Sequence, residues 1–472
     1  MRARVPAVQP KGVRVRTLVI IGAGFSGTAC ACQLLARCGD HAGNDWQIHL
    51  INASGPIARG LAYGTRSPLH LLNVPAGRLG MDPAQEGDFV RYLEDNGHRY
   101  RASAFVPRML YGEYLESRLR SAAAGHANRL RIVTARVDAI DRRPEGGFAL
   151  TLADGSTLQA DAVILAMGHL SPVAPLTALE GMAPAYINDP WSPGALERID
   201  GDERVLILGS GLTMLDVVVD LKRRGHRGPI TALSRRGLLP RSHRAQYAPP
   251  ATIPLDRDAL LAARSAHRLL RQLRAAVAQA EKACIDWRDV IGSLRAITPA
   301  LWQSLDDTEK RRFMRHLRPH WEVLRHRTAP EPFNAMNAML EDGRLAVRAG
   351  RLRAVSAGDA GLTARWDDAR HGPQALEVDR IVNCTGPGHR IDAQRAPLLH
   401  RLITGGLLTQ DALKLGLMVD PHCRALDAGG QPVEGLYYVG PLLRAQFWEA
   451  TAIPELRRHA ATAVHHLLAG TD

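Results

Sequence analysis

The sequence contains no Cys-x-x-Cys pair among its six cysteines, and the cysteines follow no regular spacing. The missing pair excludes the dithiol chemistry that disulfide reductases perform. The irregular spacing argues against a disulfide framework and favours a reducing compartment. The 19 histidines contribute to no convincing Ser-His-Asp set and to no metal-ligand cluster, so we expect no metal site.

Long apolar runs are also missing, since none approaches the roughly 18 to 20 residues of a membrane span. Residues 1–16 form a basic arm without the apolar segment of a signal peptide, so we expect a cytoplasmic protein without membrane contacts. The net charge is +13, but the basic residues form no tracts, which argues against nucleic-acid binding. The basic surface either serves anionic cofactors and substrates or is simply rich in solvated arginine.

What the chain does contain is a glycine-rich turn between an apolar strand pattern and a helical pattern, in residues 17–34. This order is typical of a dinucleotide-binding βαβ unit. The first glycine permits a tight turn, the second lets backbone approach a pyrophosphate, and the third lets the helix pack closely on the strand. The predicted cofactor contacts of this turn are Gly22, Ala23, Gly24, Ser26 and Gly27.

The next strand pattern, residues 47–51, ends in Asn52 where a Rossmann fold normally presents an acid to a ribose. An amide can also hydrogen-bond a ribose hydroxyl, so Asn52 stays a predicted contact. Short β patterns follow from about residue 130, and the last one ends at Gly168, where backbone can approach a cofactor.

Residues 204–222 repeat the opening theme, with Gly209, Ser210 and Gly211 between a strand pattern and a helical pattern. Met214 replaces the third glycine, so the helix must pack differently. The following strand ends in two arginines instead of an acid, which suits the 2′-phosphate of NADP. The alternative is a pair of solvated surface arginines. These two residues are Arg235 and Arg236.

A proline-rich linker at 239–254 leads into a basic helical region at 256–327. Leu269, Leu270 and Leu273 share one face there. Arg325 and His326, near the end of the region, either belong to a solvated basic face or line a pocket for an anionic substrate.

Residues 378–388 echo the strand that ends at Gly168 and reach Gly386, and residues 435–440 form a strand that ends at Gly440. We expect both glycines at a cofactor. A helix over 453–468 follows, and its N-terminus can face electron-rich atoms of a flavin ring. Two glycine turns, each followed later in the chain by a strand that ends at a glycine, indicate dinucleotide binding far more specifically than one glycine turn does.

A resemblance to a known family is carried by the segments GAGFSG, GLAYG, HLLNVPAGRLGMDP, FVPRMLYGEYL, AMGHLSP, INDPW, LGSGLTMLD, residues 321–327, CTGPG and VGPLLRAQFWEATAIPELR. The chain resembles bacterial FAD/NAD(P)-binding proteins of the two-dinucleotide-domain flavoprotein superfamily. These are related to flavin-containing (class B) monooxygenases and to N-hydroxylating amino-acid monooxygenases. The F-x-G-x-x-x-H signature of class B enzymes is missing, and residues 186–191 stand in its place.

The resemblance implies a role for an asparagine beside the reactive edge of a flavin, because Asn73-Val74-Pro75 with Met81 is similar to the N-x-P-x-x-x-x-M segment of class B enzymes. As a catalytic residue, Asn73 would donate a hydrogen bond to oxygen bound at the flavin. The alternative is that it only caps a turn before Pro75. The resembling segments also place Tyr63 and Glu449 at a cofactor and Trp448 at the substrate.

The predicted fold is α/β, with two Rossmann-like domains, the second inserted in the first and carrying a helical addition. We expect an FAD domain from residues 1–185 and 345–472, and an NADPH domain over 186–344 with the helical region at about 256–327. The flavin should lie in the crevice between them.

The resemblance implies a flavoprotein monooxygenase that consumes NADPH and O2, acts through a flavin hydroperoxide, and N-oxygenates a small amine or amino acid. One alternative is an FAD-dependent NAD(P)H oxidoreductase without oxygen insertion. Another is a nucleotide-binding protein without turnover. A homo-oligomer is compatible with each of these.

Overall fold

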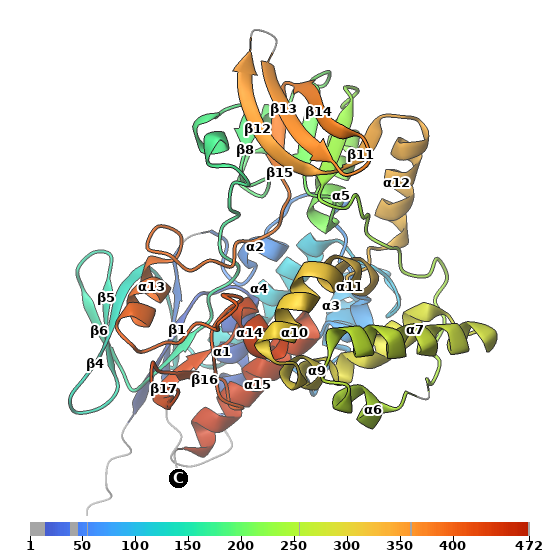
Figure 1. Ribbon diagram of the computed structural model, residues 1–472. Helices are drawn as coiled ribbons and strands as arrows, with labels where there is room; N and C mark the ends of the chain where they lie inside the picture. The colour runs from blue at the N-terminus through green and yellow to red at the C-terminus, as the bar shows by residue number, and fades with distance from the viewer. Residues whose placement is uncertain (1–14, 38–45, 54, 254, 359–360, 471–472) are drawn as a thin grey trace, which may run out of the picture.

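The computed structural model describes residues 15–37, 46–53, 55–253, 255–358 and 361–470. The basic arm predicted for residues 1–16 lies almost wholly outside them. Two mainly parallel sheets dominate the structure, which confirms the predicted α/β class (Figure 1). Within the described part of the chain, every helix is too short or too polar to cross a membrane.

The first sheet has the strand order β16-β17-β7-β1-β2-β3, and only β16 and β17 pair antiparallel. Its strands are β1 (Arg16–Ile21), β2 (Trp46–Asn52), β3 (Leu130–Thr134), β7 (Ala162–Leu165), β16 (Arg424–Leu426) and β17 (Pro432–Tyr438). Leu18, Val19 and Ile20 point to alternating faces and all are fully buried, so both faces of β1 are covered. The helices nearest this core are α1 (Phe25–Arg37), α3 (Asp88–Asp95), α4 (Arg108–Gly125) and α15 (Ile453–Ala469).

The second sheet is wholly parallel, with the order β11-β10-β9-β15-β8. Its strands are β8 (Tyr186–Ile187), β9 (Val205–Leu208), β10 (Ile230–Ser234), β11 (Leu345–Ala349) and β15 (Arg380–Asn383), with α5 (Leu212–Arg223) packed against α12 (Pro330–Glu341). In the sequence, all five strands come after β7 and before β16 of the first sheet, as expected for an inserted domain. The predicted boundary at residue 344 is too early, because β11 pairs with β10 and β15 pairs with β9.

Two small antiparallel sheets complete the β structure. They are formed by β4 (Val137–Arg142), β5 (Phe148–Leu152) and β6 (Thr157–Ala160), and by β12 (Arg351–Gly358), β13 (Gly361–Asp368) and β14 (Gly372–Val378). The second of these belongs to the inserted domain, since it lies in the sequence between β11 and β15. In Figure 1 it stands at the top, above the second sheet.

The helical addition consists of α6 (Arg257–Ala262), α7 (Ala266–Lys282), α8 (Trp287–Ser293), α9 (Thr298–Ser304), α10 (Asp307–Arg312), a π-helix (Phe313–Leu317) and α11 (Arg318–Arg325). Although it emerges from the second domain, it packs against the first (Figure 1). The Trp302 indole donates to the carbonyl of Ala445 (2.9 Å) in α14 (Arg444–Phe447), and Arg295 pairs with Glu455 in α15. The addition therefore connects the inserted domain to α14 and α15 of the first domain.

Candidate functional site

The first glycine turn is shaped by close packing at two of its three glycines. Gly22 has a φ of +108°, and a Cβ there would lie 2.5 Å from the carbonyl oxygen of Ala166 after β7. A Cβ on Gly27 would lie 1.9 Å from the Gly22 oxygen, as the prediction of close helix packing requires. A Cβ on Gly24 would meet only the Gly60 Cα, at 3.6 Å, in ordinary contact.

This difference predicts effects of different size on stability. Gly22→Ala should lower the free energy of unfolding by about 2 to 4 kcal/mol, because it adds a backbone clash to an unfavourable positive φ. Gly24→Ala is the matched control and should change it by less than about 1 kcal/mol. Urea unfolding followed by circular dichroism measures both. Equal effects of the two substitutions would contradict this account of the turn.

A cavity of about 490 Å³ lies at the carboxyl ends of β1, β2 and β7, and we call it the first-sheet cavity. Seven of the predicted cofactor contacts line it: Gly22, Ala23, Gly24, Ser26, Asn52, Tyr63 and Gly168. The N-terminus of α1 opens onto the same space, where free backbone N–H groups and the helix dipole favour phosphate. Gly27 is left to packing, as described above.

Asn52 and Tyr63 add a polar and an aromatic side chain to the lining of this cavity. The Asn52 amide nitrogen donates to the carbonyl of Gly55 (3.0 Å), while its side-chain oxygen has no partner among the described residues and can accept from a ribose hydroxyl. Tyr63, in α2 (Gly60–Tyr63), lies edge-on to Tyr111 at 4.8 Å between ring centres. Burial raises the pKa of Tyr63, so its phenol stays neutral.

The second glycine turn repeats the geometry of the first. Gly209 has a φ of +110°, and a Cβ there would lie 2.3 Å from the carbonyl oxygen of Cys384 after β15. Gly211 is at least as open as Gly24, since no atom of the described residues lies within 4 Å of a Cβ there. Met214, in place of a third glycine, is fully buried in the core of the second domain. Each turn therefore uses its first glycine for packing and keeps its second free.

The second turn borders a cavity of about 640 Å³, the second-sheet cavity. Its predicted lining residues are Asn73, Gly209, Ser210, Gly211, Arg235, Arg236, His326, Gly386 and Trp448. The two cavities share His169, Leu170, Pro441 and Thr451. Ligands held by the two glycine turns would thus meet at these four residues.

The two arginines after β10 are not equivalent. Arg236 donates to the carbonyls of Arg315 and His316 (both 2.7 Å) at the π-helix of the helical addition. The Arg235 guanidinium lines the second-sheet cavity and has no partner among the described residues. Arg235 is therefore available to an anion, whereas Arg236 holds the helical addition against the second domain.

Asn73 belongs to the first domain, yet it lines the second-sheet cavity. Its backbone carbonyl accepts a hydrogen bond from Nε2 of His243 (3.0 Å), so Nε2 of that ring carries a proton. Burial and nearby arginines lower the pKa of His243 to about 4, which keeps the ring neutral. The Asn73 side-chain amide has no hydrogen-bond partner among the described residues, so no turn-capping bond is present.

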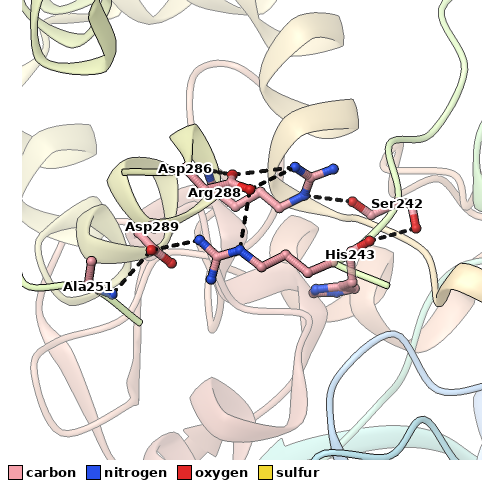
Figure 2. Close-up of polar contacts among 7 residues, drawn as sticks. Ser242, His243, Ala251, Asp286, Arg288 and Asp289 are labelled. Carbon is pink, nitrogen blue, oxygen red and sulfur yellow. Dashed lines mark hydrogen bonds and ion pairs between the residues drawn. The ribbon is translucent and has the colours of Figure 1, made fainter. Parts of the chain in front are cut away.

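Figure 2 shows how His243 is held in place. Asp289 accepts from Arg244 (2.7 Å) and from the backbone of Ala251 (3.1 Å), and Arg288 links Asp286 to the carbonyl of Ser242 (2.9 Å). This network ties the linker to α8 on both sides of His243. The helical addition thus fixes the backbone at Asn73 through one histidine.

The structure places Arg325 and Glu449 away from the lining of the two cavities. Glu449 is 4% exposed, pairs with Arg325 (Nη2 to Oε2, 3.3 Å) and accepts from the Trp321 indole (3.0 Å). Glu449 lines neither cavity, contrary to the prediction that it touches a cofactor, because its carboxylate faces the half-buried Arg325. Gly440 lines neither cavity. A Cβ there would lie 2.6 Å from the Met167 oxygen, and it is the next residue, Pro441, that lines both cavities.

Trp448 lies in a strained turn at the wall of the second-sheet cavity. Its φ of 58° and ψ of −56°, with a Glu449 N–H to Phe447 carbonyl contact of 2.6 Å, form a γ-turn of the rare, positive-φ kind. Its ring lies 4.6 Å from that of Trp302, with the Arg444 guanidinium 4.1 Å from its centre. Such strain persists where the surroundings impose it, often at functional sites.

An acidic side chain in this cavity was missed from the sequence. Glu322 is bound by Arg444 and Arg318, and His326 lies 3.4 Å away. Burial raises the pKa of Glu322, but the charges of Arg444, His326 and Arg318 outweigh it and bring the pKa to about 2. In the sequence, the i,i+4 spacing of Arg318, Glu322 and His326 could have indicated that these side chains meet.

His169 and His389, which line the same cavity, were also missed from the sequence. Burial lowers the pKa of each to about 4.

Residues 19–170 match the family model described as FAD-NAD(P)-binding, and no curated protein matches the chain. Three solved structures cover 97% of this chain and 100% of their own. They are L-lysine 6-monooxygenase from Pseudomonas syringae (16% identity, TM-score 0.64), ornithine hydroxylase from Pseudomonas aeruginosa (15%, 0.63) and the ornithine N-hydroxylase of Kutzneria sp. 744 (14%, 0.63). The chain has the fold of these two-domain flavin monooxygenases.

The described residues contain no group of three or more His, Cys, Asp or Glu side chains that could hold a metal ion. The polar groups of the two cavities are arginines, histidines, hydroxyls, amides and backbone N–H groups, with Glu322 and Asp138 as the carboxylates. This set suits phosphates and hydroxyls.

Proposed function

We propose that this protein is an FAD-dependent, NADPH-consuming monooxygenase that N-oxygenates a small amine or amino acid. The observation that carries the proposal is the meeting of two dinucleotide-type cavities at His169 and Leu170, with Asn73 on the wall. Solved structures of the same fold include an ornithine hydroxylase and an L-lysine 6-monooxygenase, which supports an amine as the substrate.

The residues of the first-sheet cavity fit FAD. The open side of Gly24 leaves room for a pyrophosphate at the N-terminus of α1, and the unpartnered oxygen of Asn52 suits a ribose hydroxyl. When bound, FAD supplies hydride acceptance from NADPH and the activation of O2. The second-sheet cavity fits NADPH, because Gly211 is open and Arg235 carries an unpaired charge beside it.

Asn73 is the proposed catalytic residue. Its free amide can donate to an oxygen atom at the flavin edge, while buried Leu72 and half-buried Val74 limit the access of water. Arg318 and Arg444 in the same cavity share the single carboxylate of Glu322, and the net positive charge of the three groups can attract the carboxylate of an amino acid. The five described cysteines are unpaired, which agrees with the proposed cytoplasmic location.

Cofactor preference tests the role of Arg235. The unmodified enzyme should prefer NADPH, and Arg235→Gln should raise the KM for NADPH by about 10- to 150-fold, since a charge-assisted contact to a phosphate is worth about 1.5 to 3 kcal/mol. The KM for NADH should change little. Arg236→Gln is the matched control and should have a smaller effect, because its guanidinium already binds two carbonyls. Equal use of NADH and NADPH by the unmodified enzyme would refute the assignment.

Mixing the purified protein with NADPH in the absence of O2 tests the pairing of the two cavities. We expect the visible absorbance of bound FAD to bleach as NADPH is oxidised, and to return when O2 is added with an amine. A protein that binds both nucleotides without bleaching would be a non-catalytic nucleotide-binding protein. A protein that bleaches but never oxygenates an amine would be an NAD(P)H oxidoreductase.

A further inference from the structure

The helical addition encloses an apolar cavity that the proposed reaction does not use, and we call it the insert cavity. Its volume is about 760 Å³, within the range of sites that hold drug-sized ligands. Leu269, Leu273 and Val277 of α7 form one wall, and Ile291 and Leu301 lie among the residues of the other walls. The cavity is lined mainly by helices of the addition, of which α7 lies on the right of Figure 1.

The apolar face of α7 is only partly covered by protein. The helix is held near its start, where the Ala266 N–H donates to Glu309 (2.8 Å) and the Gln272 amide donates to the carbonyl of Ala259 (3.2 Å). Beyond these contacts Leu273 and Val277 are only half-buried, whereas Ile291 opposite is 6% exposed. Apolar side chains left in this state gain from any ligand that removes them from water.

The rim of the insert cavity is mainly basic. Arg241 and Arg274 are exposed lining residues, and neither guanidinium has a partner among the described residues. A third lining arginine, Arg288, is already paired with Asp286. His316, His320 and the single carboxylate of Glu281 complete the titratable groups. Two free positive charges at the edge of an apolar space favour an anionic head group on an apolar chain.

The insert cavity also touches the second-sheet cavity. Trp448 lines both of them, and its strained turn and its contact with the Trp302 ring hold it between the two spaces. A chain that fills the insert cavity would therefore pack against a wall of the proposed NADPH site.

We propose that the insert cavity binds an amphiphile with a single apolar chain and an anionic head group. The chain lies between α7 and the helices opposite, and the head group lies at Arg241 and Arg274. The site adjoins the second-sheet cavity at Trp448 but is neither of the two dinucleotide cavities. The proposal does not rest on the monooxygenase activity, because binding alone tests it.

Calorimetric titration of the full-length protein with dodecanoate, below its micelle concentration, tests the proposal. We expect saturable binding that tightens by about 15-fold for each two-carbon extension from octanoate to dodecanoate, since each buried methylene contributes about fourfold. Dodecyltrimethylammonium should bind at least about tenfold more weakly. Absence of saturable dodecanoate binding would overturn the proposal.

Two variants identify the site. Leu273→Trp, which fills the cavity, should weaken dodecanoate binding by about tenfold or more while FAD content and NADPH oxidation persist. The double variant Arg241→Gln, Arg274→Gln should keep chain-length dependence but lose the preference for carboxylate over ammonium. Unchanged binding in both variants would refute the site. If dodecanoate fails to bind and Leu273→Arg converts a dimer into a monomer, the cavity is a subunit interface and the proposal is wrong.

Discussion

Gly24→Val should yield folded protein that has lost nearly all of its FAD. Gly24 lines the first-sheet cavity, and among the described residues a Cβ there would have only the Gly60 Cα within 4 Å. A branched side chain there would occupy the path of the pyrophosphate, and displacement of a phosphate from a helix N-terminus removes several charge-assisted contacts. We expect FAD affinity to fall by at least about 100-fold, since each such contact is worth about 1.5 to 3 kcal/mol. The ratio of flavin to protein absorbance after gel filtration measures it.

Gly211→Val is the matched control for this substitution. Gly211 holds the equivalent position in the second turn and is equally open, so this variant should keep its FAD and lose affinity for NADPH instead. Circular dichroism confirms that both variants fold. A Gly24→Val protein with full FAD content, or a Gly211→Val protein without FAD, would show that the cavities are assigned to the wrong cofactors.

Asn73→Ala should separate NADPH consumption from oxygen transfer. The variant keeps both glycine turns, so FAD content and NADPH-driven flavin reduction should persist. Loss of one preorganised donor at a reacting oxygen costs about 10²- to 10³-fold in comparable sites. We therefore expect the yield of oxygenated product per NADPH to fall by about that factor, while hydrogen peroxide per NADPH rises towards one. Unchanged coupling in the folded variant would show that Asn73 is structural.

His243→Phe tests the positioning of Asn73. The substitution removes the Nε2 hydrogen bond to the Asn73 carbonyl and can preserve the ring contact with Phe105, whose ring centre lies 4.8 Å away. Coupling should weaken by less than in Asn73→Ala, by about three- to tenfold, with FAD content unchanged. His243→Gln, which can still donate to the carbonyl, should recover part of the coupling. Equal coupling in the wild type and His243→Phe would exclude the positioning role.

The local patterns of the sequence predicted the two glycine turns and their flanking strands. Gly22 and Gly209 can be predicted because each turn repeats a strand, a tight bend and a helix within a few residues. The domain boundary at 344 was wrong because β15 joins β9 across more than 170 residues of sequence. The similarity between the segments that end at Gly168 and Gly386 indicated the correct boundary, since it implies that the second segment belongs to the second sheet. β7 lies beside β1 in the first sheet, and β15 lies beside β9 in the second.

The contacts of the helical addition could not be predicted from local patterns. Arg235 and Arg236 are adjacent and alike in the sequence, and only the docking of the π-helix makes one of them a structural residue. Glu449 is predicted at a cofactor because it lies in a resembling segment, but Arg325 approaches it from another domain. The link from His243 to Asn73 likewise joins residues 170 apart in sequence.

The most direct test of the proposed monooxygenase is turnover with NADPH and heavy-isotope O2 against a panel of amino acids and amines, with products weighed by mass spectrometry. The account predicts that at least one amine accelerates NADPH oxidation and gains one labelled oxygen atom on its nitrogen, with more product than hydrogen peroxide. If every amine leaves the rate unchanged and all of the consumed O2 appears as hydrogen peroxide, the protein does not N-oxygenate amines.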